Sequence, residues 1–182
     1  MSRKLSILNI GGHPKDAIMY AGGTLAKHVA NGDRVCTLTP THGLSHHGRA
    51  LDDYKKGIEV DLGAMIEERK EELIEAASEL GVHDVRFLGH NDDVVLPREG
   101  IIEEIAEVIG DVRPDIVITH WPYDTVAAHA NATQMTLLAM EAAACIRPGK
   151  AAPHGVHQVY YHSVQGRTNY RENYRPLNPT TV

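Results

Sequence analysis

Short apolar runs alternate with longer helix-like segments along this chain, and this alternation constrains the fold more than any other feature. Five runs of mostly aliphatic and β-branched residues predict strands over residues 5–10, 35–39, 85–88, 116–119 and 158–162. Strands that alternate with helices are typical of βαβ units and of a mainly parallel sheet. The pattern therefore predicts an α/β fold of the Rossmann-like kind, a sandwich of three layers.

The segments between the strands predict helices over residues 17–30, 62–80, 101–109 and 130–144. Residues 43–57 are polar, rich in His and without clear periodicity, so we expect a long loop there. The chain contains no internal repeat, and we expect one domain over residues 1–182. Its polar tail ends as if another strand should follow, which favours a domain that is truncated at the C-terminus.

The composition is that of a soluble globular protein, with 42% hydrophobic and 23% charged residues. A net charge of −6 without a Lys or Arg cluster argues against nucleic acid or an anionic membrane as a partner. No apolar run approaches the length of a membrane span. Cys36 and Cys145 suit buried thiols better than a disulfide framework, so we expect a cytoplasmic protein.

Imidazole and carboxylate groups follow the predicted strands at the points where these strands end. In an open α/β sheet, ligands bind beyond the carboxyl ends of the strands, so these side chains are expected at one edge. The segments concerned are GGHPKD (11–16), THG (41–43), GHNDD (89–93) and HWPYD (120–124), the last followed by His129.

His13, Asp16 and His129 are the residues that we expect to hold a metal ion. His13 and Asp16 stand three residues apart across the turn that starts the first helix, and His129 lies after the fourth strand, at the start of another helix. Two imidazoles and one carboxylate suit Zn²⁺ and leave a fourth position for water, as in catalytic zinc sites. Taken alone, His13 to Asp16 also fits a plain helix start, with Asp16 as its N-cap.

The order of these motifs resembles that of the LmbE/PIG-L family of zinc-dependent deacetylases. The similarity begins at HPKD (13–16) and AGGTLA (21–26), and it extends over roughly residues 5–145. It continues through THG (41–43), RKEEL (69–73), LGV (80–82), LGHND (88–92), RPDIV (113–117) and DTVAAH (124–129). The resemblance implies His13, Asp16 and His129 as zinc ligands.

Two positions depart from the family pattern. Lys15 stands where family members usually have the Asp that acts as general base, and a protonated ammonium cannot accept a proton. Residues 126–129 read VAAH where the family commonly has His-Pro-Asp-His, so the His that helps to stabilise the tetrahedral intermediate and its supporting Asp are both missing. Metal binding is therefore better supported by the sequence than deacetylation.

The role of base can pass to Asp92, Asp93, Asp124 or His42, and we rank Asp92 first because it matches an Asp that the family places in its pocket. Asp92 also fits a plain turn residue. Together with Lys15 and His42 it forms the predicted catalytic set. Arg69, at a family position that can contact an anionic part of the substrate, and Asp124 are the predicted substrate-binding residues, although Arg69 also fits a solvated helix charge.

The sequence thus predicts an amidohydrolase that removes an acyl group from an N-acetylglucosamine-type amine, with a small-molecule substrate and a possible homo-oligomeric state. One alternative is a zinc-dependent hydratase or lyase that acts on an unsaturated carboxylic acid, in which Lys15 holds a substrate carboxylate. Another is a catalytically impaired homologue. A dinucleotide-binding domain is disfavoured because no G-x-G-x-x-G follows the first strand.

Overall fold

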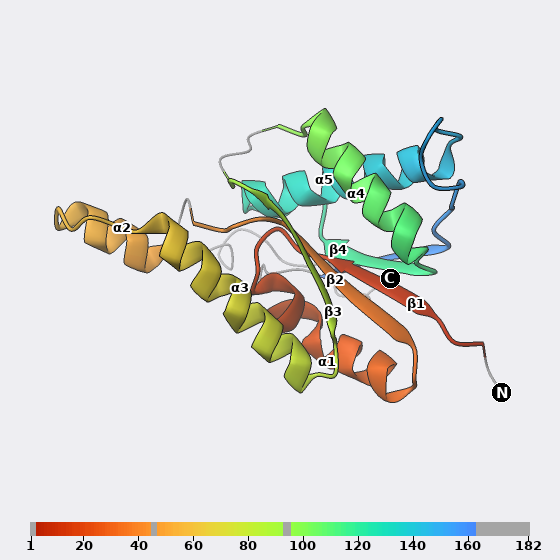
Figure 1. Ribbon diagram of the computed structural model, residues 1–182, viewed down its shortest axis with the longest axis horizontal. Coiled ribbons are helices and arrows are strands. Elements are labelled where there is room, and N and C mark those ends of the chain that lie inside the picture. The colour runs from red at the N-terminus through yellow and green to blue at the C-terminus, as the bar shows by residue number, and fades with distance from the viewer. Residues whose placement is uncertain (1–2, 45–46, 93–95, 163–182) are drawn as a thin grey trace, which may run out of the picture.

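The computed structural model of the protein describes residues 3–44, 47–92 and 96–162, and its centre is a five-stranded parallel sheet. The strands lie in the order β3-β2-β1-β4-β5, so β1 is central and the chain moves outward on both sides of it (Figure 1). The predicted parallel α/β fold is confirmed. The strands are β1 (Ser6–Ile10), β2 (Arg34–Thr41), β3 (Asp84–His90), β4 (Ile116–His120) and β5 (Gln158–His162).

Helices cover both faces of the sheet and make the predicted three layers. In the view of Figure 1, α4 (Glu99–Val112) and α5 (Ala127–Ala144) lie above the sheet, and α1 (Asp16–Ala30) and α3 (Leu62–Glu79) lie below it. Within the described residues, no helix combines the length and the apolarity that crossing a membrane would need.

Alternate residues of the central strands supply two separate cores. Leu8, on β1, packs in a cluster with buried side chains of α4 and α5, whereas its neighbour Ile7 packs with α1 and with Ala77 of α3. This is the two-residue period of a strand that is buried on both faces. The central strands are therefore packed on both faces, and their carboxyl ends carry the loops of the site.

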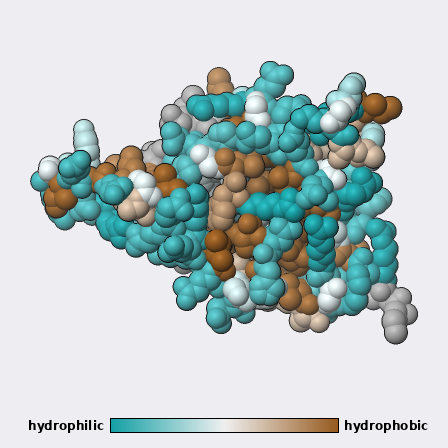
Figure 2. Space-filling view, in the orientation of Figure 1, coloured by the Kyte–Doolittle hydropathy of each residue, from teal (hydrophilic) through white to brown (hydrophobic). Residues whose placement is uncertain are grey.

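The prediction of one long loop over residues 43–57 is wrong, because α2 (Gly48–Lys55) lies within it. Its apolar residues Ala50, Leu51 and Tyr54 lie on one side, but the helix has only eight residues and buries only Ala50, so the pattern is too short to mark it as helical in the sequence. With the start of α3 it extends sideways from the body of the molecule, and hydrophobic side chains are visible on it (Figures 1 and 2).

The predicted boundaries shift at two places that matter for the site. Helix α5 begins at Ala127 rather than at residue 130, so His129 lies on its first turn instead of in the preceding loop. Strand β2 continues through Pro40 to Thr41, and its register with β3 shifts between Thr39 and Thr41. A proline donates no hydrogen bond, which explains why the regular ladder breaks there.

Candidate metal centre

The loop after β1 carries the first two residues of the site. Lys15 is the N-cap of α1, and Asp16 is the first residue of that helix rather than its cap. The Asp16 Oδ2 atom accepts a hydrogen bond from the backbone N–H of His13 at 2.7 Å, which folds the loop back on itself. A Cβ atom on Gly11 would lie 2.9 Å from Asp16 Cβ, so the tight approach of this loop to the helix requires a glycine.

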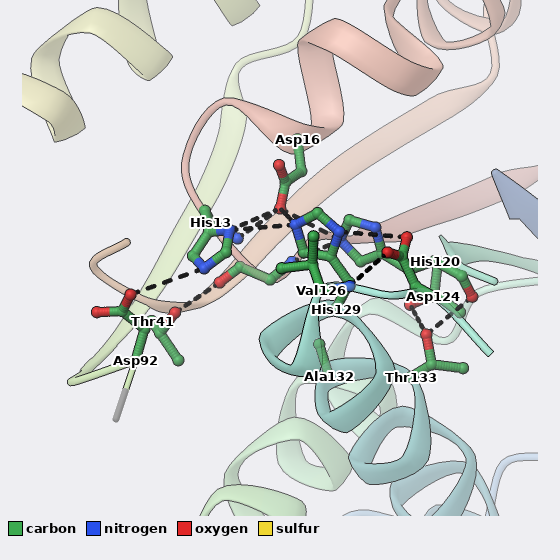
Figure 3. A network of polar contacts seen from close by, with 12 residues as sticks. His13, Asp16, Thr41, Asp92, His120, Asp124, Val126, His129, Ala132 and Thr133 are labelled. Atoms are coloured by element: carbon green, nitrogen blue, oxygen red, sulfur yellow. Dashed lines mark hydrogen bonds and ion pairs between the residues drawn. The ribbon is translucent and has the colours of Figure 1, made fainter. Parts of the chain in front are cut away.

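Three side-chain atoms of His13, Asp16 and His129 converge at the carboxyl edge of the sheet (Figure 3). Asp16 Oδ2 lies 3.4 Å from His13 Nδ1 and 3.5 Å from His129 Nε2, and these two nitrogens are 3.3 Å apart. Ligands at the corners of a tetrahedron around Zn²⁺, with bonds of about 2.0–2.2 Å, lie roughly 3.3–3.5 Å from one another. The spacing of the three atoms thus fits three corners of a tetrahedral zinc site.

Each of the two histidines has a carboxylate at its other ring nitrogen. Asp124 Oδ2 lies 3.3 Å from His129 Nδ1, and Asp92 Oδ2 lies 3.8 Å from His13 Nε2 (Figure 3). Backbone N–H groups hold both carboxylates, that of Val126 on Asp124 at 2.9 Å and that of Leu44 on Asp92 at 3.0 Å. A carboxylate behind a ligating histidine is the arrangement that orients imidazoles in metal sites.

The charge of the group suits a cation. Burial alone would raise the pKa of Asp16, but hydrogen bonds with His120 and His13 hold it well below its ordinary value. Burial also works to raise the pKa of Asp124, whereas its contacts with His129 and the Val126 N–H lower it. Asp16 Oδ1 is buried and has no hydrogen-bond partner among the described residues. Both carboxylates are therefore ionised at neutral pH, and the donor set fits a divalent metal.

Two further histidines, to which the sequence analysis gives no role, lie deeper in the same group. His120 ends β4, is fully buried, and its Nε2 atom accepts the Gly12 N–H at 2.9 Å and lies 3.2 Å from Asp16 Oδ2. Its ring stacks on that of His129 at 3.9 Å, and the ring of His162, at the end of β5, meets it edge-on at 4.4 Å.

These inner histidines are neutral at physiological pH. Burial lowers the pKa of His120, and it lowers that of His162 to about 4. His120 Nε2 lies close to both the Gly12 N–H and Asp16 Oδ2, and His120 Nδ1 is buried without a hydrogen-bond partner among the described residues. A sequence signal existed, because both histidines occur at the carboxyl ends of predicted strands, where site residues of α/β sheets collect.

The remaining predicted residues lie around this group. Lys15 is exposed at the start of α1, and Arg69 lies on α3, where its Nη1 atom donates to His47 Nε2 at 2.7 Å. His42 follows β2, and its backbone N–H donates to His90 O at 2.9 Å. Burial and the charge of Lys70 lower the pKa of His42. The predictions for Asp93 and for the tail after residue 162 lie outside the described residues.

Comparisons with known proteins agree with the geometry. The family model described as PIG-L, GlcNAc-PI de-N-acetylase, matches residues 8–143. A 1D-myo-inositol 2-acetamido-2-deoxy-α-D-glucopyranoside deacetylase of Thermomonospora curvata is 30% identical over 175 residues, which are 85% of this chain and 58% of the relative. The chain thus spans less than two thirds of that enzyme.

Two solved structures are similar in fold. The 4-carboxy-2-hydroxymuconate hydratase GalB of Pseudomonas putida KT2440 superposes with a TM-score of 0.75 and 26% identity, over 87% of this chain and 65% of the hydratase. The N,N'-diacetylchitobiose deacetylase of Pyrococcus horikoshii superposes with a TM-score of 0.63 and 20% identity, over 86% of this chain and 59% of the deacetylase. The same scaffold therefore carries both amide hydrolysis and hydration among its known members.

Proposed function

This chain belongs to the PIG-L family of GlcNAc-PI de-N-acetylases, and we propose that it is a zinc-dependent hydrolase that removes the acyl group from an N-acetylglucosamine-type amine. One observation carries the proposal: His13, Asp16 and His129 present three ligand atoms at mutual distances of 3.3 to 3.5 Å. The relative from Thermomonospora curvata, which carries the name of such a deacetylase, supports the choice of substrate class.

We propose that His13 Nδ1, Asp16 Oδ2 and His129 Nε2 hold the ion and that the ion is Zn²⁺. Two imidazoles and one carboxylate are a common ligand set for this metal in hydrolases. When bound, a zinc ion supplies Lewis-acid chemistry, because it polarises a carbonyl oxygen and makes water a stronger acid. Asp124 and Asp92 are expected to hold the two rings in the ligating orientation.

We assign the proton-accepting role to Asp92, with His42 as the second candidate. Asp92 Oδ2 lies 3.8 Å from His13 Nε2, and the Leu44 N–H fixes Asp92 Oδ1, so the carboxylate is held beside the His13 ring. Lys15 can only donate hydrogen bonds when protonated, so its proposed role is to bind a substrate oxygen. Arg69 is proposed as a second substrate-binding cation, and Asp124 acts on the substrate through the orientation of His129.

The direct test incubates the zinc-loaded protein with N-acetylglucosamine and with an N-acetylglucosaminyl inositol, and measures released acetate and free amine. The proposal expects both products in equal amounts, and it expects no release by the metal-free protein. Acetate release that survives metal removal and the His13→Ala and His129→Ala substitutions would contradict the proposal.

A second candidate function is hydration of an unsaturated carboxylic acid. It is favoured by Lys15 in place of the usual base and by the similarity to the hydratase GalB. Loss of the ultraviolet absorbance of an unsaturated dicarboxylate, without acetate release from any amide, would select this function. Zinc binding without either activity would instead indicate a catalytically impaired homologue.

A further inference from the structure

A cavity of about 200 Å³ opens between the start of α1 and the middle of α3, beside the loop that carries His13 and Asp16. Its walls are mainly hydrophobic, and an apolar cavity of about 150 Å³ is already large enough to hold a benzene molecule. The volume thus suits one six-membered ring or a short acyl chain. The residues that line it are Pro14, Lys15, Ile18, Met19, Arg69, Glu72, Leu73 and Ala76.

Lys15 and Arg69 both line this cavity, and among the described residues neither forms an ion pair with a carboxylate. Arg69 is held by His47 through Nη1, and its Nε atom is buried without a hydrogen-bond partner among the described residues. Burial and the positive charges of Arg69, Arg49 and Lys15 lower the pKa of His47, so this imidazole stays neutral beside Arg69. Arg49, by contrast, is paired with Glu68 at 2.6 Å.

The lining favours an anionic occupant over a neutral polar one. Ile18, Met19 and Leu73 offer no hydrogen bonds to the hydroxyl groups of a sugar, whereas Lys15 and Arg69 offer several cationic donors. Glu72 is the opposing charge in the lining, and it is exposed to solvent on α3. A ligand with an apolar ring or chain and one carboxylate can contact both the hydrophobic walls and the two cations.

We propose that the cavity between α1 and α3 is a substrate subsite for an apolar group that bears a carboxylate, with Arg69 and Lys15 as the residues that bind the carboxylate. This inference rests on the proposed function and deepens it, because it narrows the substrates to N-acetylglucosamine-type amines that carry an apolar ring or short chain with a carboxylate. An unsaturated carboxylic acid has the same apolar and anionic parts, so the subsite could serve either reaction.

Binding of two matched probes tests the subsite without any turnover. 3-Phenylpropionate carries the ring and the carboxylate, and 3-phenylpropanamide has the same shape without the charge. Titration of the zinc-loaded protein by calorimetry should give a Kd for the acid that is lower by about tenfold or more, because hydrogen bonds to charged groups are the stronger ones. Equal affinities would overturn the proposal.

Variants separate this subsite from binding elsewhere. Arg69→Met and Lys15→Met should each weaken binding of the acid about tenfold and leave binding of the amide unchanged. Lys70→Met is the matched control, because Lys70 is the next residue on α3 and pairs with Glu67 at 2.8 Å. Ala76→Phe should fill the cavity and abolish binding of both probes, while Ile74→Phe, on the exposed side of α3, should not.

Different results would contradict the proposed deacetylase function and the proposed subsite. Binding of the acid by a protein that releases no acetate from any amide would retain the subsite and remove the deacetylase function. Acetate release from neutral N-acetylglucosamine, with no preference of the protein for 3-phenylpropionate over its amide, would do the reverse. If Lys70→Met weakened binding of the acid as much as Arg69→Met, the carboxylate would not lie in this cavity and the proposal would fall. Thermal unfolding of each variant checks that the chain is folded.

Discussion

At the scale of single residues, the proposed centre needs two sets of atoms. One set would bind the ion, and the other, the oxygens of neighbouring carboxylates, orients the histidine rings. His129 uses one nitrogen toward Asp16 and the other toward Asp124, and it is almost completely buried. Neither nitrogen is then free to adapt, so the ring has one position. Its replacement should affect metal binding far more than replacement of a histidine elsewhere.

We therefore expect His13→Ala and His129→Ala to lose the bound zinc, because each removes one of the three proposed ligands. Elemental analysis after gel filtration measures the metal content of each variant. His83→Ala, which removes an exposed histidine next to β3, is the control and should retain one equivalent. Retention of zinc by both site variants would exclude the assignment.

Replacement of Asp124 and of Asp92 by the corresponding amide should have different effects. Asp124→Asn should weaken zinc binding by about 10- to 100-fold, the usual effect of losing an outer carboxylate, as measured by competition with a chelator. Asp92→Asn, if Asp92 is the base, should lower the turnover rate steeply with zinc content unchanged, because Asp92 lies 3.8 Å from His13 and orients that ring less tightly than Asp124, at 3.3 Å, orients His129. A turn residue would tolerate Asn, so full activity of Asp92→Asn would remove the catalytic role.

Lys15 gives a third prediction at this scale. Lys15→Asp restores a carboxylate where the family usually has one, and a well-placed base is typically worth about 10²–10⁴ in rate. We expect hydrolysis of N-acetylglucosamine-type amides to rise within that range, with acetate release as the measurement and Lys15→Met as the control without a base. Undetectable hydrolysis before and after the change would favour the hydratase.

At the scale of elements, the loop after β2 closes one side of the centre. Gly43 has a positive φ of 72°, and a Cβ atom built on it would lie 3.0 Å from His13 Cβ and 3.1 Å from His13 Cδ2. The glycine therefore serves two needs, a left-handed backbone and a close approach to His13, a proposed ligand.

Gly43→Ala should consequently displace the His13 ring and weaken zinc binding, in addition to the backbone strain. Gly57→Ala isolates the strain, because Gly57 has a φ of 70° and nothing within 4 Å of its Cβ position. We expect both variants to lose some stability on thermal unfolding and only Gly43→Ala to lose zinc affinity. Equal zinc affinities of the two variants would contradict this view of the loop.

The elements also explain which parts of the molecule the sequence predicts. The central strands and the large helices bury regular apolar sets, so their periodicity is visible in the sequence, and the five strands and the helices α1, α3, α4 and α5 are confirmed. Helix α2 buries only Ala50, and its eight residues are too few for an apolar period to be recognised. Elements that take no part in the core are the ones that pattern analysis misses.

The candidate site is likewise predictable only in part, because the sheet topology can be predicted from the sequence and the detailed turns cannot. His13, Asp16 and His129 follow strands, so the topology of the sheet brings them to one edge. The position of Asp124 behind His129 depends on the turn between β4 and α5, and the inward direction of His120 depends on the pleat of β4. Neither is encoded in residue spacing alone.

At the scale of the whole molecule, metal binding should raise the free energy of unfolding. A ligand that binds only the folded chain stabilises it by about 2.7 kcal/mol at a free concentration of 100 times its Kd. Zinc at that excess should raise the Tm measured by calorimetry, and a chelator should reverse the rise. The His129→Ala variant should show no such rise, and an equal rise in this variant would place the zinc elsewhere.

The contact between His13 and His129 joins positions that are 116 residues apart in the chain. An ion held between them would act as a reversible cross-link that ties the two ends of most of the described sequence together while the chain is folded. Unlike a disulfide, it would leave when the chain unfolds, so it would stabilise the folded chain by binding and not by restricting the unfolded one. The two tied ends are the loop before α1 and the first turn of α5. Metal release would uncouple these two segments while the apolar cores on either side of the sheet stay packed, so the chain would soften at the mouth of the site first.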